Sequence, residues 1–150
     1  MSRALLVIDL QEGYIEKYPP LLLTRINERI REATIEKEII VYVKNTKKLR
    51  SGRKTNSLAE NLKICSGFII CKETASAFSN DDLQGILLQN QVTEIEIVGI
   101  DGNSCVANTA IDSMKYGYKT ILHCEYIGVQ NVDRFAKKKV LLSEKGIIIK

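Results

Sequence analysis

The sequence predicts a three-layer α/β/α fold of the Rossmann-like type, with a six-stranded parallel sheet in the order 3-2-1-4-5-6. Short apolar runs alternate along the chain with longer stretches whose apolar residues recur at helical spacing. The runs are too short for helices and too continuous for strands with one wet face, which is typical of parallel strands covered on both sides. With 150 residues, 45% of them hydrophobic, we expect one domain over residues 1–150.

Six apolar runs are the expected strands. They are bounded by polar or glycine-containing segments, and helical stretches separate most of them, as in right-handed βαβ units. The expected strands are residues 4–10, 38–43, 67–71, 94–99, 118–123 and 146–149.

Two helices are expected in the first two thirds of the chain. Pro19 and Pro20 suit the first turn of a helix, and the apolar residues that follow share one face: Leu22, Leu23, Ile26 and Ile30. Asp81 and Asp82 open a second helix, which carries Leu83, Ile86 and Leu87, and their charges favour the amino-terminal end of the helix dipole.

Two more helices are expected in the last third. Asn103 or Ser104 can cap a helix that stops at Gly117, a favourable residue just beyond a helix end. A last helix is expected over residues 132–142. No repeat or linker divides the chain, so no second domain is expected.

Three ionisable side chains stand at carboxyl ends of the expected strands. Asp9 closes the first, Lys72 follows the third, and Cys105 lies in the turn after the fourth, where a helix begins. Parallel sheets bind ligands at this edge, near the point where the strand order reverses. A helix start lowers the pKa of a thiol, so we expect Cys105 to be alkylated at a lower pH than the other cysteines. Asp9 as base and Lys72 as cationic partner would complete the set.

Each of these residues also has a structural interpretation. Cysteine at a buried helix start is a common packing choice, aspartate after a strand often caps a turn, and a lysine at a strand end is usually solvent-exposed. The only histidine, His123, lies within an apolar run and is expected in the core or in a pocket wall, which disfavours a Cys-His pair. The remaining cysteines are expected as small buried hydrophobes, with a pocket wall as the alternative for the last of them: Cys65, Cys71 and Cys124.

Composition excludes several classes of protein. The net charge of +4 is modest, and the basic stretch 44–63 lacks interleaved aromatics, so solvated surface is favoured over an anion-binding loop, and nucleic acid is not an expected partner. No apolar run approaches the ~20 residues that span a bilayer, and no signal-peptide pattern opens the sequence, so no membrane contact and a cytoplasmic location are expected. Four cysteines without CxxC spacing favour free thiols over disulfides or a zinc knuckle.

Three sequence blocks resemble one family. The first is LLVIDLQEGY, with Asp9, Gln11 and Tyr14; the second is Lys72 followed by Ser-Ala-Phe at 76–78; the third is VGIDGNSCVANTAIDSMKYGY around Cys105. Together they are similar to the isochorismatase-like cysteine hydrolases, which include nicotinamidases and N-carbamoylsarcosine amidases. Any one block is weakly specific, but three in order at the expected strand ends are strong.

The resemblance implies a role for each matching residue. Asp9 would accept the thiol proton, Lys72 would stabilise the thiolate, and Cys105 would attack a carbonyl to form a thioester that water hydrolyses. A cis peptide bond between Ile100 and Asp101 would aim the Asp101 N–H, together with that of Cys105, at the oxyanion. Substrate contacts are expected from Gln11, Tyr14 and Phe78.

The chain also departs from the family pattern. The stretch after the second expected strand lacks the Asp-x-His pattern with which nicotinamidases bind a metal, so no metal and no other cofactor is expected. Asp101 stands where many relatives have a small residue, and its carboxylate would repel anionic substrates or point to solvent. Gly102 replaces the usual threonine, and the chain is shorter than typical members in the loops that build the substrate wall.

Two classes of function follow. The first is a metal-independent cysteine hydrolase that cleaves a C–N bond in a small amide or ureido-type substrate, for which the Asp, Lys and Cys are all present. The second is a non-catalytic or regulatory member of the same fold that binds a small ligand, which the short pocket wall favours. We also expect a homo-oligomer, a dimer or higher, because a neighbour's loop would complete a thin wall.

Overall fold

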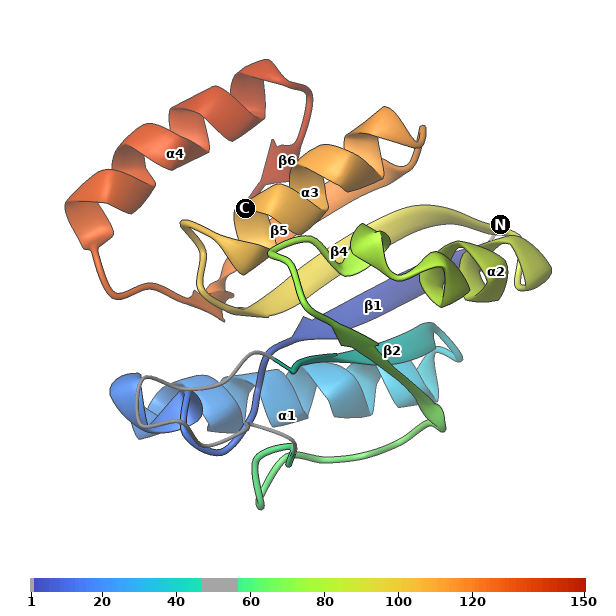
Figure 1. The fold of residues 1–150 in the computed structure, drawn as a ribbon, viewed down its shortest axis with the longest axis horizontal. Coiled ribbons are helices and arrows are strands. Elements are labelled where there is room, and N and C mark those ends of the chain that lie inside the picture. The colour runs from blue at the N-terminus through green and yellow to red at the C-terminus, as the bar shows by residue number, and fades with distance from the viewer. Residues whose placement is uncertain (1, 47–56) are drawn as a thin grey trace.

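The computed structural model describes residues 2–46 and 57–150. Within these residues the chain forms one six-stranded sheet in the order β3-β2-β1-β4-β5-β6, and every neighbouring pair is parallel (Figure 1). The predicted fold class and strand order are therefore confirmed. The order reverses between β1 and β4, which are neighbours in the middle of the sheet.

The strands agree with the predicted runs, with shifted ends: β1 (Ser2–Ile8), β2 (Ile39–Asn45), β3 (Phe68–Lys72), β4 (Val92–Ile100), β5 (Lys119–Gly128) and β6 (Ile148–Ile149). β1 ends before the predicted residue 10 because Asp9 has a φ of 56°, which leaves the extended region. β5 continues past the predicted residue 123 to Gly128, although its register with β4 is broken between the Ile97–Leu122 and Gly99–Ile127 pairs.

The helices begin where the capping signals place them: α1 (Pro20–Ile35), α2 (Asp81–Gln89), α3 (Cys105–Lys115) and α4 (Val132–Glu144), with 3₁₀ turns η1 (Ile15–Lys17) and η2 (Ala77–Ser79). Asn80 caps α2 by accepting a hydrogen bond from the Asp82 N–H at 2.8 Å. Ser104 is the N-cap residue of α3 but makes no side-chain cap. The Asp101 carbonyl accepts from the Ser104 and Val106 N–H groups instead, each at 3.1 Å. None of the helices among the described residues is long and apolar enough to cross a bilayer.

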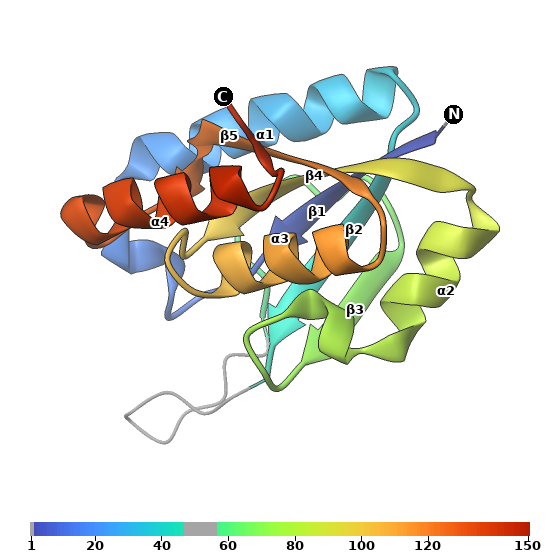
Figure 2. The same cartoon turned by 90° about the horizontal axis from the view of Figure 1, so that it is seen from above.

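Helices cover the two faces of the sheet unequally (Figure 2). α1 lies on one face, where Leu22, Ile26 and Ile30 pack against side chains of β1, β2 and β4. α2, α3 and α4 lie on the other face and contribute to the larger core cluster. This arrangement places the carboxyl ends of β1, β3 and β4 at one edge of the sheet.

The prediction that Cys65 and Cys71 are buried is wrong, since both are exposed. β3 is an edge strand, and Ile69 and Cys71 are exposed on the face opposite the one on which Ile70 and Lys72 are buried. Only one face of this strand is covered, so its continuous apolar run does not mean burial on both sides. Cys124 is partly buried and packs against the larger core cluster, in keeping with its structural interpretation.

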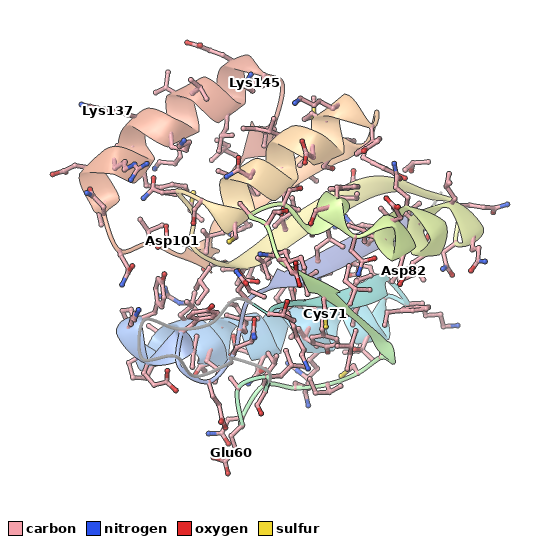
Figure 3. The ribbon with its side chains drawn as sticks, in the orientation of Figure 1. Glu60, Cys71, Asp82, Asp101, Lys137 and Lys145 are labelled. Carbon is pink, nitrogen blue, oxygen red and sulfur yellow. The ribbon has the colours of Figure 1, made fainter. Side chains whose placement is uncertain are left out.

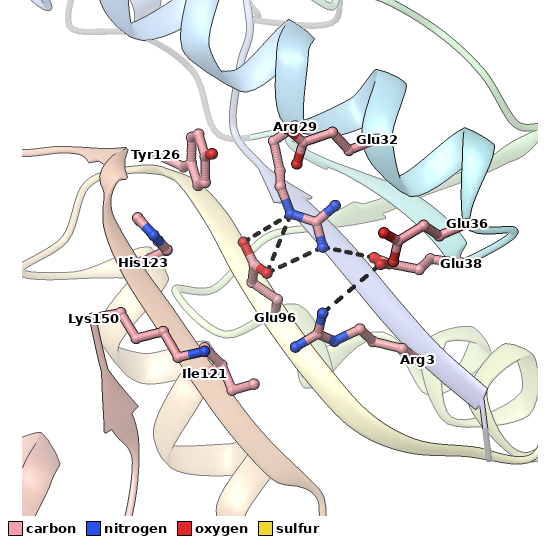
Figure 4. A pocket seen from close by; sticks show the side chains of 10 residues that line it. All are labelled: Arg3, Arg29, Glu32, Glu36, Glu38, Glu96, Ile121, His123, Tyr126 and Lys150. Carbon is pink, nitrogen blue, oxygen red and sulfur yellow. Dashed lines mark hydrogen bonds and ion pairs between the residues drawn. The ribbon is translucent and has the colours of Figure 1, made fainter.

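A buried network of charges holds α1 to the sheet (Figure 4). The Arg29 guanidinium donates to Glu96 of β4 at 3.1 Å and to Glu38 at 2.7 Å, and all three side chains are less than a tenth exposed. Arg3 extends the network by pairing with Glu38 and with Glu94. The network lines a pocket of about 230 Å³ on the α1 side of the sheet. His123 lies in the wall of this pocket, which is one of the two positions expected for it, the other being the core.

We predict that Arg29→Met lowers the free energy of unfolding by about 3 kcal/mol, because it leaves the Glu96 carboxylate buried without its main partner. Arg29→Met combined with Glu96→Leu is expected to restore part of this loss, since the unpaired carboxylate is then gone. Urea unfolding measures both. Lys115→Met is the control, because Lys115 is 72% exposed and its pair with Asp112 spans 3.9 Å, so a change below about 0.5 kcal/mol is expected. A loss for Arg29→Met no larger than that of the control would contradict the prediction.

Candidate active site

The candidate site lies at the carboxyl edge of the sheet, where the strand order reverses. Asp9 follows β1 directly, Lys72 is the last residue of β3, and Cys105 is the first residue of α3 after β4. The strand ends therefore bring together three residues that are distant in the sequence. Asp9 and Lys72 are 63 positions apart, and Lys72 and Cys105 are 33 apart. This is the position at which parallel sheets bind ligands.

The Lys72 ammonium joins the three residues. It donates to Asp9 Oδ2 at 3.2 Å, to the Thr74 carbonyl at 3.1 Å and to Cys105 Sγ at 3.4 Å. These contacts match the three donors of an ammonium group. The Lys72 side chain is fully buried, so the prediction from its residue type alone, a solvent-exposed lysine, does not hold.

Asp9 is held in place by its backbone as well as by its side chain. Its φ of 56° lies in the left-handed region, which costs a non-glycine residue about 1–2 kcal/mol, and its N–H donates to the Val43 carbonyl at 3.0 Å. Burial raises the pKa of Asp9, while the charge of Lys72 and hydrogen bonds from Cys105, Lys72 and Asn45 act in the opposite direction. The result is a carboxylate that is a stronger base than a solvated aspartate.

The Cys105 thiol is not activated in the way the sequence predicted. Burial raises its pKa to about 11, the negative charge of Asp9 adds to this, and the Lys72 ammonium only partly opposes it. The prediction that the pKa of Cys105 is lowered is therefore wrong, because burial and the neighbouring carboxylate both disfavour the thiolate. In the resting site the thiol is protonated and lies beside a base.

The turn from β4 to α3 has the backbone that the resemblance implied. The peptide bond between Ile100 and Asp101 is cis. Gly99 precedes it with a φ of 121°, and a Cβ at this position would overlap the carbonyl oxygen of Ile8, one residue before Asp9. The backbones of β4 and β1 thus approach closely just before the two segments that carry Cys105 and Asp9.

The three residues expected to contact substrate lie in different environments. Gln11 is fully buried, and its amide pairs with the backbone of Asn45, donating to the carbonyl at 3.0 Å and accepting from the N–H at 2.7 Å. Tyr14 is half-buried at the start of η1 and packs against the apolar cluster between α1 and the sheet.

Phe78 is only 5% exposed, and its ring stacks on that of Tyr116 with centroids 5.1 Å apart. Tyr116 follows the last residue of α3, whereas Cys105 is the first, so the two ends are separated by about 16 Å at 1.5 Å per residue. The structure therefore places Phe78 in the core beside the far end of α3, and its contact with substrate stays a prediction.

Sequence reasoning missed two residues at this edge of the sheet. Tyr18 donates its hydroxyl hydrogen bond to Asp101 Oδ2 at 2.9 Å, and the charges of Asp101, Cys105 and Asp9 raise its pKa in addition to burial. Asn45 lies beside Asp9 at the end of β2. Neither residue belongs to the quoted sequence blocks; only the position of Asn45 just after an apolar run was a signal for it.

The question of a metal concerns the segment after β2. The described residues contain no group of three or more histidine, cysteine, aspartate and glutamate side chains placed to hold an ion. The chain's single histidine is His123, in the pocket on the α1 side. The central part of the basic stretch, residues 47–56, lies outside the described residues.

Comparison with known proteins identifies the family. The Isochorismatase domain family matches residues 3–133, most of the chain. The chain belongs to the isochorismatase family. A curated relative, an uncharacterised isochorismatase family protein of Bacillus subtilis, is 29% identical over 65 residues. That match covers 43% of this chain and 36% of the relative, so the chain spans little more than a third of this curated relative.

Solved structures of the family share the fold. Pyrazinamidase of Pyrococcus horikoshii, solved in complex with zinc, superimposes with a TM-score of 0.86 at 22% identity, covering 100% of this chain and 99% of the other. N-carbamoylsarcosine amidase of Thermoplasma acidophilum gives 0.83 at 18% identity, covering 100% and 96%. The nicotinamidase of Staphylococcus aureus gives 0.81 at 22% identity, covering all of both chains. These likenesses show that the chain shares the fold of these amidases.

We predict that the charges of Asp9 and Lys72 shift the pKa of the Cys105 thiol in opposite directions. In a Cys65→Ser/Cys71→Ser background, the rate of iodoacetamide alkylation at Cys105, followed by peptide mass, is expected to rise with a midpoint of about pH 11. Asp9→Asn is expected to lower this midpoint because a negative neighbour is lost, and Lys72→Met is expected to raise it because the cation is lost. A midpoint in the parent protein at or below the ordinary thiol value of about 8.5 would contradict the prediction.

We also predict that Gly99→Ala disrupts the site and the fold together. The added methyl group overlaps the Ile8 backbone, so a loss of at least about 3 kcal/mol in unfolding free energy is expected. Gly117→Ala is the matched control, because Gly117 also has a positive φ, 88°, but nothing lies within 4 Å of an added Cβ. It is expected to lose about 1–2 kcal/mol from backbone strain alone. Equal losses for the two variants would refute the steric argument.

Proposed function

We propose that this protein is a metal-independent cysteine hydrolase that cleaves a C–N bond in a small amide or ureido-type substrate. The observation that carries the proposal is the Lys72 ammonium, which is buried and contacts both Asp9 and Cys105. A buried lysine bound to a carboxylate and a thiol is costly for stability and has a direct use in thiol chemistry. Membership in the isochorismatase family supports the reaction class.

The proposed reaction starts from a neutral thiol. Asp9 takes the proton of Cys105 while Sγ attacks the substrate carbonyl carbon, and Lys72 stabilises the sulfur as it loses the proton. The raised pKa of Asp9 suits this step because it makes the carboxylate a better proton acceptor. The same proton then passes to the leaving nitrogen, the C–N bond breaks, and a thioester to Cys105 remains. Water, deprotonated by Asp9, attacks the thioester and releases the acid and the thiol.

The charge that develops on the carbonyl oxygen needs preorganised donors. The N–H groups of Asp101 and Cys105 flank the turn before α3 and are the candidate pair, with the amino-terminal end of the α3 dipole adding to them. The Asp101 carbonyl holds this turn through the Ser104 and Val106 N–H groups. Donors fixed in this way do not have to reorganise when the oxyanion forms.

Metal independence rests on the ligand types present. The zinc of the Pyrococcus protein belongs to that relative. In this chain the single histidine lines a pocket on the α1 side of the sheet, away from the strand ends that carry the triad. We also retain the expectations of a small-molecule substrate and of a homo-oligomer as proposals.

The test is a panel of small amides and ureido compounds, with product release and the intact mass of the protein as readouts. For any compound that is turned over, Cys105→Ala is expected to abolish hydrolysis, and Asp9→Asn and Lys72→Met to slow it by about a hundredfold or more each. Because the three groups serve one sulfur, the losses of the double variant are not expected to add. A mass increase confined to the Cys105 peptide is expected for slow substrates.

Cys71→Ser is the matched control, because Cys71 is an exposed thiol next to Lys72 in the sequence. It is expected to leave hydrolysis unchanged. Turnover that survives Cys105→Ala would sink the mechanism. Tight binding of a panel compound without product or adduct would instead favour a ligand-binding member of the family.

A further inference from the structure

Asp101 stands at an unusual junction of three segments. Its carboxylate accepts hydrogen bonds from the Asn103 N–H at 2.8 Å, from the Tyr18 hydroxyl at 2.9 Å and from the Gln130 N–H at 3.0 Å. These donors belong to the β4–α3 turn, to the segment between β1 and α1, and to the segment between β5 and α4. One side chain therefore ties together three connections at the carboxyl edge of the sheet.

Of the two expected roles of Asp101, pointing to solvent does not describe its position. Asp101 is half-buried, and both carboxylate oxygens are engaged by donors. Three donors spread the negative charge and orient the carboxylate toward the neighbouring segments. A satisfied carboxylate beside the turn opposes a developing oxyanion much less than a free one.

Tyr18 fits this junction closely. A Cβ at Gly128 would lie 2.7 Å from Tyr18 Cδ1 and 2.6 Å from Ile100 Cγ2, so the absence of a side chain at Gly128 makes room for both. The Tyr18 ring thus packs beside the residue that precedes Asp101. Burial and the charge of Asp101 raise the pKa of Tyr18, which keeps its hydroxyl a donor at all physiological pH values.

The backbone of Asp101 is engaged at the same time. Its carbonyl accepts from the Ser104 and Val106 N–H groups, which fixes the first turn of α3, and the Gly102 N–H donates to the Gly128 carbonyl at 2.9 Å. The backbone hydrogen bonds of the β4–α3 turn therefore converge on the Asp101 carbonyl. The contacts of the Asp101 side chain tie the same turn to the neighbouring segments. The N–H groups of this residue and of Cys105 are the candidate oxyanion donors.

We propose that the Asp101 carboxylate and the Tyr18 hydroxyl are positioning groups that hold the oxyanion-binding turn. This inference rests on the proposed function, because it assigns these two side chains to the same carbonyl chemistry. They act through the Asp101 and Cys105 N–H groups and not on the thiol. Their loss therefore affects reactions that form an oxyanion and spares reactions of the same sulfur that do not.

The test compares two reactions of Cys105 in the full-length protein. Acylation by p-nitrophenyl acetate forms a tetrahedral oxyanion, whereas alkylation by iodoacetamide displaces iodide and forms none. Both rates are measured on the Cys105 peptide by mass spectrometry across pH. Tyr18→Phe is expected to slow acylation by about tenfold and Asp101→Ala by about a hundredfold, with the alkylation rate and its pH midpoint within about twofold of the parent.

Tyr116→Phe is the matched control, because it removes an exposed tyrosine hydroxyl at the far end of α3, and it is expected to change neither rate. Tyr18→Phe removes one oxygen atom and keeps the ring, so it carries the test if Asp101→Ala does not fold. Acylation at the parent rate in Tyr18→Phe would overturn the inference, as would equal losses in acylation and alkylation. If the parent protein is alkylated but never acylated at Cys105, the proposed function itself fails.

Discussion

The site depends on one buried cation. Lys72 has no solvent to share its charge with, so its ammonium must find every partner within the protein, and it finds a carboxylate, a carbonyl and a thiol. Removing a charge from water costs several kcal/mol unless a counter-charge and hydrogen bonds replace the solvent. Asp9 supplies the counter-charge only because the chain leaves the extended region directly after β1. The positions of β1, β3 and α3 are therefore coupled through a single nitrogen atom.

Two buried charge clusters serve different ends of the same sheet. On the α1 side, the Arg29 guanidinium pairs with the Glu38 and Glu96 carboxylates, so the cluster acts as a fixed tie between α1 and β4 (Figure 4). At the carboxyl edge, one partner of Lys72 is a thiol that carries a proton at rest. That proton lies beside a carboxylate whose own pKa is raised, which suits the proposed transfer of the proton from sulfur to oxygen. Figure 3 labels two residues near the carboxyl-edge cluster: Asp101, which directly follows β4, and Cys71 of the edge strand β3, which precedes Lys72 in the sequence.

The positions of residues at strand ends could be predicted from the sequence. The burial of single side chains could not, because it depends on which elements lie next to them in space. Asp9, Lys72 and Cys105 could be brought together because the carboxyl ends of parallel strands share an edge. The exposure of Cys71 could not be foreseen, because it follows from the edge position of β3, which the strand order sets. The position of Phe78 against Tyr116 depends on how η2 packs on α3, which no local pattern encodes. The raised pKa of Cys105 could not be predicted from the sequence, because it follows from the burial of the thiol and from the Asp9 carboxylate beside it.

One packing constraint acts on the turn at position 102. A Cβ at Gly102 would lie 2.8 Å from Phe135 of α4, 2.9 Å from Val129 and 3.0 Å from Ile127, so a side chain there would force its neighbours to shift. A glycine offers the turn no side-chain hydrogen bond, so the polar groups of the turn need partners from neighbouring positions. Asp101 supplies them from the preceding position, where its carboxylate reaches Tyr18 and Gln130. Apolar packing around Gly102 and the carboxylate contacts of Asp101 thus act on the same turn, the first by excluding a side chain and the second by supplying hydrogen-bond acceptors.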